Sequence, residues 1–347
     1  MKKENTVNYA MILAIILPFV IFGIFMTSQG KSAVNVYIDM IKTVIINKYG
    51  FCEVVIKWAP LLLTALAAII PAKAGISNVG GEGQLIAGAL GSAIAGIYIF
   101  NETIRIVGIP LVLLCGMLAG MLWAGVASFC KLKLKMNDTL TTMVLNYVMV
   151  DIACLMIYGP IKDTSGDNYP YSAPIEASLR FTTISGTRLN IGIALAFVTT
   201  ILTAVFLYKT KNGLYTQLVG KNYRAAALNG LNVKKIQNRA FLCAGALAGL
   251  GGAILICGVE GRLRTTTGSN LGYLGFLAAG IAWNNPIIAI FTTFLISIII
   301  TPFLLKFLQT LYAFQVLSAH NKEVFPNLQV SLSLFQVLSD ISVYILY

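Results

Sequence analysis

Long apolar runs constrain this sequence more than any other feature, because each is about as long as a helix that crosses a bilayer. A hydrocarbon core of about 30 Å corresponds to roughly 20 helical residues. The runs are continuous rather than alternating, and only 11% of the 347 residues are charged, against about a quarter in soluble domains. The sequence therefore predicts an all-α, polytopic membrane protein with about ten transmembrane helices. The runs lie near residues 9–26, 54–70, 85–100, 106–129, 140–158, 191–208, 241–258, 271–283, 286–305 and 328–346.

Two basic loops set the predicted orientation. The loop at 131–135 carries three lysines, and the loop at 209–239 carries seven basic residues and no acidic one. Basic residues concentrate in cytoplasmic loops, so both loops and both termini are expected in the cytoplasm, with the loop at 162–188 outside. The formal net charge of +12 fits contact with anionic membrane lipid, and nucleic acid is not an expected partner.

A glycine-rich polar segment at residues 74–85 joins two apolar runs and is the first candidate for a functional site. It contains four glycines together with Asn78, Glu82 and Gln84. Irregular backbone at membrane depth is tolerated only inside protein or beside a water-filled cavity. One interpretation is a broken-helix element before the third helix, whose three polar side chains line a substrate pathway. The other, equally open, is a tight cytoplasmic turn whose acid caps a helix.

A short capped helix is predicted within the basic loop, at residues 222–230. Asn222 is a favourable N-cap, and Gly230 is favourable just past the C-terminus, which leaves about two turns between them. Three consecutive alanines, with Ala226 in the middle, keep this helix narrow, and Arg224 adds a positive charge. Such a helix suits docking into a groove on a partner protein. A solvated connector is the alternative.

Small residues recur at four-residue spacing in two of the predicted helices. One row contains Gly116, Gly120 and Ala124, and another contains Gly245 and Gly249. Such rows let helix backbones approach closely in a membrane. They predict helix packing within the chain, with a dimer contact as the alternative.

Signatures of catalysis are absent from the sequence. It has no G-x-x-x-x-G-K-[ST] phosphate loop, and its six cysteines are scattered without a C-x-x-C pair. His320 is the only histidine, which excludes histidine metal clusters and Ser/His/Asp triads. The chain is therefore not expected to be an enzyme or to hold a metal or cofactor. If ATP drives transport, another subunit must bind it.

Several motifs occur together in one order along the chain. They lie at residues 78–84 (N-V-G-G-E-G-Q), 137–147 (N-D-T-L-T-T-M-V-L-N-Y), 158–163, 222–231, 245–253, 272–273 and 284–286. In this combination the sequence resembles the permease subunits of ABC importers in the ribose, branched-chain amino acid and nucleoside superfamily. It is most similar to the simple-sugar and nucleoside branch.

The resemblance implies a function and a set of partners. The chain, residues 1–347, would be one permease domain in the inner or plasma membrane of a bacterial cell. It would pair with a second permease subunit, identical or related, and an external lipoprotein would deliver a nucleoside or simple sugar. Two cytoplasmic ATP-binding subunits would drive transport. They would engage the loop at 209–239 through Asn222, Arg224, Ala226 and Gly230.

The fifth predicted helix carries further polar residues. Asn146 and Tyr147 are candidates for the same pathway lining as the glycine-rich segment. Asp151 lies about halfway along this helix, where it could bind a proton or Na⁺, face the pathway or pair with an amide. An ion-driven secondary transporter of a small polar solute is therefore the alternative function. Simple sugars, purine or pyrimidine nucleosides and branched-chain amino acids all remain possible substrates.

Overall fold

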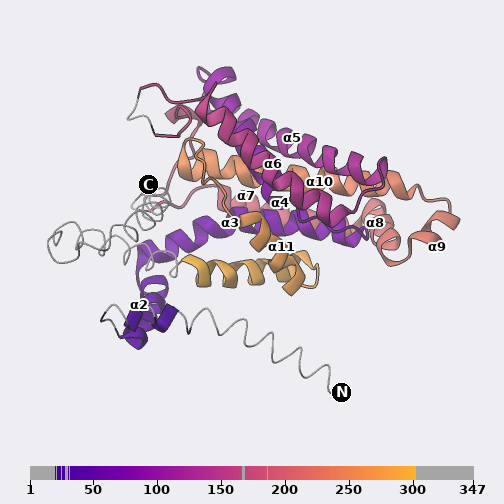
Figure 1. The fold of residues 1–347 in the computed structure, drawn as a ribbon, viewed down its shortest axis with the longest axis horizontal. Helices are drawn as coiled ribbons and strands as arrows, with labels where there is room; N and C mark the ends of the chain where they lie inside the picture. The colour runs from indigo at the N-terminus through magenta and orange to yellow at the C-terminus, as the bar shows by residue number, and fades with distance from the viewer. Residues whose placement is uncertain are drawn as a thin grey trace, which may run out of the picture. The chain divides into compact units, whose positions relative to one another are not determined.

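The structure of this chain is a computed structural model made of helices and loops (Figure 1). It describes residues 20, 22–24, 26–27, 30, 32–165, 169–185 and 187–301. Cys52–Ile299 form one compact unit, and the described residues outside that range belong to a second. The helices are α2 (Ala33–Ile45), α3 (Lys48–Lys73), α4 (Gly81–Ile94), α5 (Arg105–Leu132), α6 (Asp138–Tyr158), α7 (Gly192–Lys209), α8 (Lys211–Lys221), α9 (Tyr223–Leu228), α10 (Val233–Leu255), α11 (Leu271–Ile281) and Pro286–Thr301.

In the part of the chain that the structure describes, six helices are long and apolar enough to cross a membrane. They are α3, α5, α6, α7, and α4 and α10 together with their π-helical extensions Ala95–Ile99 and Ile256–Glu260. Two further apolar helices, α11 and Pro286–Thr301, are shorter. Each predicted apolar run between residues 54 and 301 therefore coincides with a helix, and residues 302–305 of the last of these runs lie outside the described residues. The run at 328–346 and most of that at 9–26 lie outside the described residues, so the total of ten stays a prediction.

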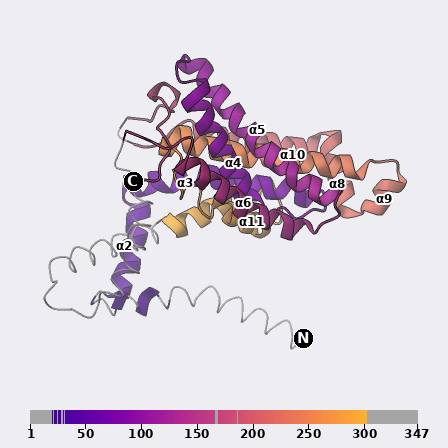
Figure 2. The same ribbon diagram turned by 45° about the horizontal axis from the view of Figure 1, so that its top comes forward.

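Rows of small residues bring α4, α5 and α10 together in the larger unit (Figure 2). A Cβ atom on Gly249 would press against the carbonyl oxygen of Gly116, and one on Gly245 against that of Gly120. Gly88 of α4 meets Gly249 in the same way. The helices can approach this closely because these positions carry no side chain. The prediction that the rows pack within the chain is confirmed.

The loops separate into two groups at opposite ends of the larger unit. The α3–α4 loop contacts the start of α6 and the end of α8. At the other end, the chain between α6 and α7 forms backbone hydrogen bonds with the segment that follows α10. Loops predicted to share one side of the membrane thus lie together. Which end faces the cytoplasm stays a prediction.

Candidate functional site

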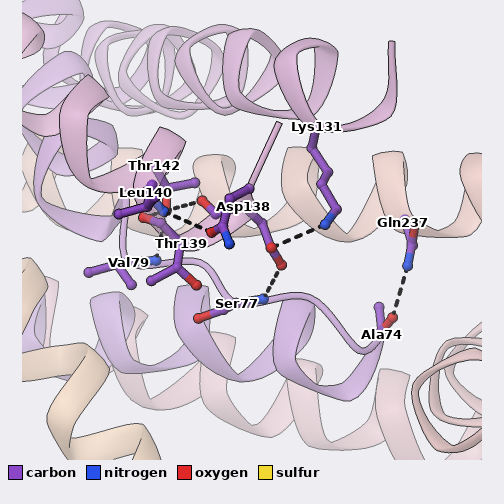
Figure 3. A network of polar contacts seen from close by, with 10 residues as sticks. Ala74, Ser77, Val79, Lys131, Asp138, Thr139, Leu140, Thr142 and Gln237 are labelled. Atoms are coloured by element: carbon purple, nitrogen blue, oxygen red, sulfur yellow. Dashed lines mark hydrogen bonds and ion pairs between the residues drawn. The ribbon is translucent and has the colours of Figure 1, made fainter. Parts of the chain in front are cut away.

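The loop between α3 and α4 is fastened to one face of α6 (Figure 3). Asp138 and Thr142 are one helical turn apart, so their side chains point the same way. The Ser77 amide donates a hydrogen bond to Asp138 Oδ2 at 2.9 Å, and the Val79 amide donates to Thr142 Oγ1 at 3.2 Å. Lys131 Nζ, from the end of α5, lies 3.1 Å from Asp138 Oδ1. Asp138 therefore links the loop to both α5 and α6.

Asn146 continues the same face of α6 by one more turn. Its Nδ2 donates to the Val79 carbonyl at 3.0 Å, and its Oδ1 accepts from the Gly83 amide at 2.8 Å. A Cβ atom on Gly83 would lie 3.0 Å from both Asn146 Oδ1 and Trp123 Nε1. Glycine at position 83 therefore lets the first turn of α4 pack directly against the side-chain amide group of Asn146.

Asn78 and Gln84 form a buried amide pair inside the loop. Gln84 Nε2 donates to Asn78 Oδ1 at 3.1 Å, and Asn78 Nδ2 donates to Gln84 Oε1 at 3.2 Å. Asn78 Nδ2 also donates to the carbonyl of Ala67 at 3.1 Å. Ala67 lies six residues before the end of α3 at Lys73, a rise of about 9 Å. The loop thus folds back along α3, and α4 begins well inside the end of its neighbour.

Glu82 caps the start of a different helix, α11. Its Oε1 accepts from the Asn270 amide at 2.7 Å, and its Oε2 accepts from the Gly272 amide at 2.6 Å. Asn270 is the N-cap of α11, with a left-handed φ of 66°. A carboxylate is favoured here because the first amides of a helix lack partners within it and carry partial positive charge. A Cβ atom on Gly272 would overlap the Glu82 amide, so the starts of α4 and α11 touch.

The α3–α4 loop also contacts the end of α8. Gly75 has a left-handed φ of +72°, and a Cβ atom on it would lie 3.2 Å from the Gly220 Cα atom. A Cβ atom on Gly220 would in turn overlap the Lys73 carbonyl. Gln237 of α10 reaches the Ala74 carbonyl at 3.5 Å (Figure 3). Backbone contact between two glycines therefore joins the polar loop to the segment that leads into α9.

The predicted caps of the short helix in the basic loop are confirmed. Asn222 Oδ1 accepts from the amides of Arg224 and Ala225, each at 3.1 Å. Gly230 has a φ of +80°, and its amide donates to the Ala227 carbonyl at 3.0 Å. This pattern is the ordinary way in which glycine ends a helix.

The two faces of α9 differ in exposure. Ala226 is only 6% exposed because it is turned toward the chain itself, whereas Leu228 is 89% exposed. Arg224 lies over the ring of Tyr223, with its guanidinium carbon 5.7 Å from the ring centroid. Leu228 and the Tyr223–Arg224 pair thus form the outward surface of α9.

The structure brings four of the five predicted pathway residues into one buried cluster: Asn78, Glu82, Gln84 and Asn146. Tyr147 is 59% exposed beside it, near the hydroxyl of Tyr273 from α11. The four coupling candidates lie together on or next to α9, away from this cluster.

Sequence reasoning missed two groups of residues that hold the cluster. The four-residue spacing of Asp138, Thr142 and Asn146 was available as a signal, because it places them on one face of a helix. Asn270 and Gly272 carried no local signal for Glu82, since they lie 188 and 190 residues further along the chain. Hydrogen bonding within the cluster joins α3, α4, α6 and α11.

Comparison with known proteins adds to this geometry. Residues 50–325 match a family model described as branched-chain amino acid transport system, permease component. A nucleoside ABC transporter permease protein of Lactococcus lactis is 28% identical, covering 84% of this chain and 82% of the relative. A glucose ABC transporter permease protein of Haloferax volcanii is 26% identical, over 80% of the chain and 75% of the relative. A guanosine ABC transporter permease protein of Bacillus subtilis is 25% identical, over 70% of each. No solved structure matches the chain.

Proposed function

Because the chain belongs to the family of permease components of branched-chain amino acid transport systems, we propose that it is the membrane subunit of an ATP-driven importer for a nucleoside or simple sugar. As a multi-pass permease component it is not itself catalytic. The family match over residues 50–325 carries this proposal, and the relatives named for nucleoside, guanosine and glucose transport support its substrate class.

The partners follow from the same proposal. Two cytoplasmic ATP-binding subunits drive transport and bind the ATP. A second permease subunit completes the pathway, and an external lipoprotein delivers the solute. The ATP-binding subunits dock on the loop at 209–239, where the outward surface of α9 presents Leu228 to a groove. Asn222 and Gly230 hold this helix in shape, and Ala226 seats it on the rest of the chain.

The buried cluster has a role beside the pathway in this proposal. Asn78, Glu82, Gln84 and Asn146 fix where α4 and α11 begin, and Tyr147 lies at the rim of the cluster. The cluster therefore positions the helices around the solute, while capture of the solute is the task of the lipoprotein.

Uptake measurements test the function directly. Cells with and without this gene are supplied with radiolabelled guanosine, uridine, glucose and leucine. Uptake of a nucleoside or of glucose that requires both this gene and its ATP-binding subunit supports the proposal. Uptake that persists without the ATP-binding subunit and follows an ion gradient would establish the secondary-transporter alternative instead.

A further inference from the structure

The helix α6 has two faces of different character. Its buried face carries Asn146, which holds the α3–α4 loop, followed by apolar residues. The opposite face is exposed in the chain and is mostly apolar, but it contains Tyr147 and, one turn later, Asp151. Residues four apart lie one above the other on a helix, so these two side chains form a polar stripe.

Asp151 lies deep within the span rather than at its end. At about 1.5 Å per residue, it is about 20 Å from the start of α6 at Asp138 and about 10 Å from the end at Tyr158. None of the ion pairs among the described residues includes Asp151. Acids within membrane helices almost always face protein or a water-filled cavity. We therefore expect the part of this face around Asp151 to meet protein or water rather than lipid.

The stripe is continuous with the polar cluster. The hydroxyl of Tyr273, on α11, lies near the side chains of both Asn146 and Tyr147. Tyrosine combines an apolar ring with a hydroxyl that seeks a polar partner. The exposed stripe of Tyr147 and Asp151 on α6 therefore begins where the half-buried Tyr273 of α11 meets the polar cluster.

We propose that Tyr147, Asp151 and Tyr273 line the water-filled part of the translocation pathway, and that the Asp151 carboxylate binds neighbouring hydroxyl groups of the solute. This inference rests on the proposed transport function. An ionised carboxylate only accepts hydrogen bonds, and its two oxygens suit two adjacent hydroxyl donors. A ribose and a hexose both provide such a pair. A branched-chain amino acid has no hydroxyl pair, and only its α-ammonium group could donate to this carboxylate.

Thiol accessibility tests the placement without relying on transport. In the assembled transporter, made free of native cysteines, Asp151→Cys is treated with the charged reagent methanethiosulfonate ethylsulfonate. The control is Ile201→Cys, at a position that is also exposed, midway along α7 among mostly apolar neighbours. We expect modification of Asp151→Cys at least tenfold faster than of the control. Equal, slow rates would mean that the stripe is sealed against a partner subunit, and would overturn the proposal.

Protection and substitution test the binding role and identify the sugar. In Tyr147→Cys, which keeps the Asp151 carboxylate one turn away, modification that is slowed by millimolar guanosine points to a ribose, and modification that is slowed by glucose points to a hexose. Protection by neither solute overturns hydroxyl binding. Asp151→Leu should lower uptake at least tenfold at an unchanged membrane level, and Asp151→Asn should retain part of it. Uptake at the original rate in Asp151→Leu would also overturn the proposal. If the unmodified transporter takes up neither solute, the proposed function fails, while the accessibility result still decides whether water reaches Asp151.

Discussion

At the scale of single residues, Glu82 shows how local sequence can identify a functional group but miss its partner. Its glycine-rich surroundings marked it as special, and helix capping was one of two open interpretations. The structure shows a cap, but on α11 rather than on α4, where Glu82 itself resides. Helix-capping rules relate residues within a few positions, and they cannot find a partner 188 residues away.

Substitutions of Glu82 should separate its charge from its hydrogen bonding. In Glu82→Leu, the amides of Asn270 and Gly272 both lose their acceptor, and the buried Gly272 amide alone costs about 1–3 kcal/mol. Glu82→Gln keeps one acceptor oxygen but turns an NH₂ group toward the other amide. We therefore expect the melting temperature in detergent to be highest for the original protein, lower for Glu82→Gln and lowest for Glu82→Leu. Glu82→Gln should retain part of the uptake, and Glu82→Leu should retain almost none.

The control for these variants is Glu102, an exposed acid in the loop between α4 and α5. Glu102→Gln and Glu102→Leu should leave the melting temperature within a degree or two. If Glu82→Leu melts and transports like the original protein, the contact with α11 contributes nothing to either property.

At the scale of elements, α9 was well predicted because its limits depend on local chemistry. An asparagine before the first turn and a glycine after the last one act within four residues, so the sequence was sufficient. The direction in which the helix faces depends on tertiary packing. The structure turns Ala226 inward and Leu228 outward, which moves the expected contact with the ATP-binding subunits from Ala226 to Leu228.

Two variants on α9 should therefore fail in different ways. Leu228→Asp places a charge in the proposed docking surface, so the purified permease should keep its melting temperature and lose at least tenfold in recovery of bound ATP-binding subunits. Ala226→Trp forces a large ring into a buried site, so it should lower the melting temperature of the permease itself. Normal recovery of ATP-binding subunits with Leu228→Asp would show that α9 is a solvated connector.

The glycine contact between α8 and the α3–α4 loop should also matter for coupling. In Gly220→Ala the added methyl group meets the Lys73 carbonyl, so the end of α8 must move away from Gly75. We expect the assembled transporter to hydrolyse ATP within about twofold of the original rate, with uptake per ATP reduced severalfold. Gly280→Ala is the control, because a Cβ atom there meets nothing within 4 Å. Unchanged uptake per ATP in Gly220→Ala would show that this contact does not transmit motion.

At the scale of the whole molecule, hydrophobicity predicted where most of the helices lie, but the sequence did not predict which helices contact one another. Runs of apolar residues located the long apolar helices between α3 and Thr301 because lipid demands about 20 apolar residues per crossing, but they did not locate α2 or α8. The glycine rows predicted close packing, but not that Gly249 of α10 would meet both Gly88 of α4 and Gly116 of α5. Which rows meet depends on how helices distant in sequence cross, and a single sequence carries no such information.

The predicted orientation is open to a labelling experiment. Ser185 and Asn229 are both exposed, and they lie in loops expected on opposite sides of the membrane. In a cysteine-free background, an impermeant maleimide added to intact cells should label Ser185→Cys and not Asn229→Cys. After the cells are opened, both should react. The reverse pattern in intact cells would invert the topology.

The long separation between Glu82 and its partners also bears on how the protein is made. At about 5–20 residues per second, about 10–40 s pass between synthesis of Glu82 and of Asn270, 188 residues later. During that interval α4 has entered the insertion machinery, but α11 does not yet exist. The nascent chain must therefore keep this carboxyl group in water, or against another polar group, until α11 arrives. Release of α4 into lipid is thus expected to wait until the last third of the chain has been made. On this view α4 and α11 leave the insertion machinery together rather than one after the other.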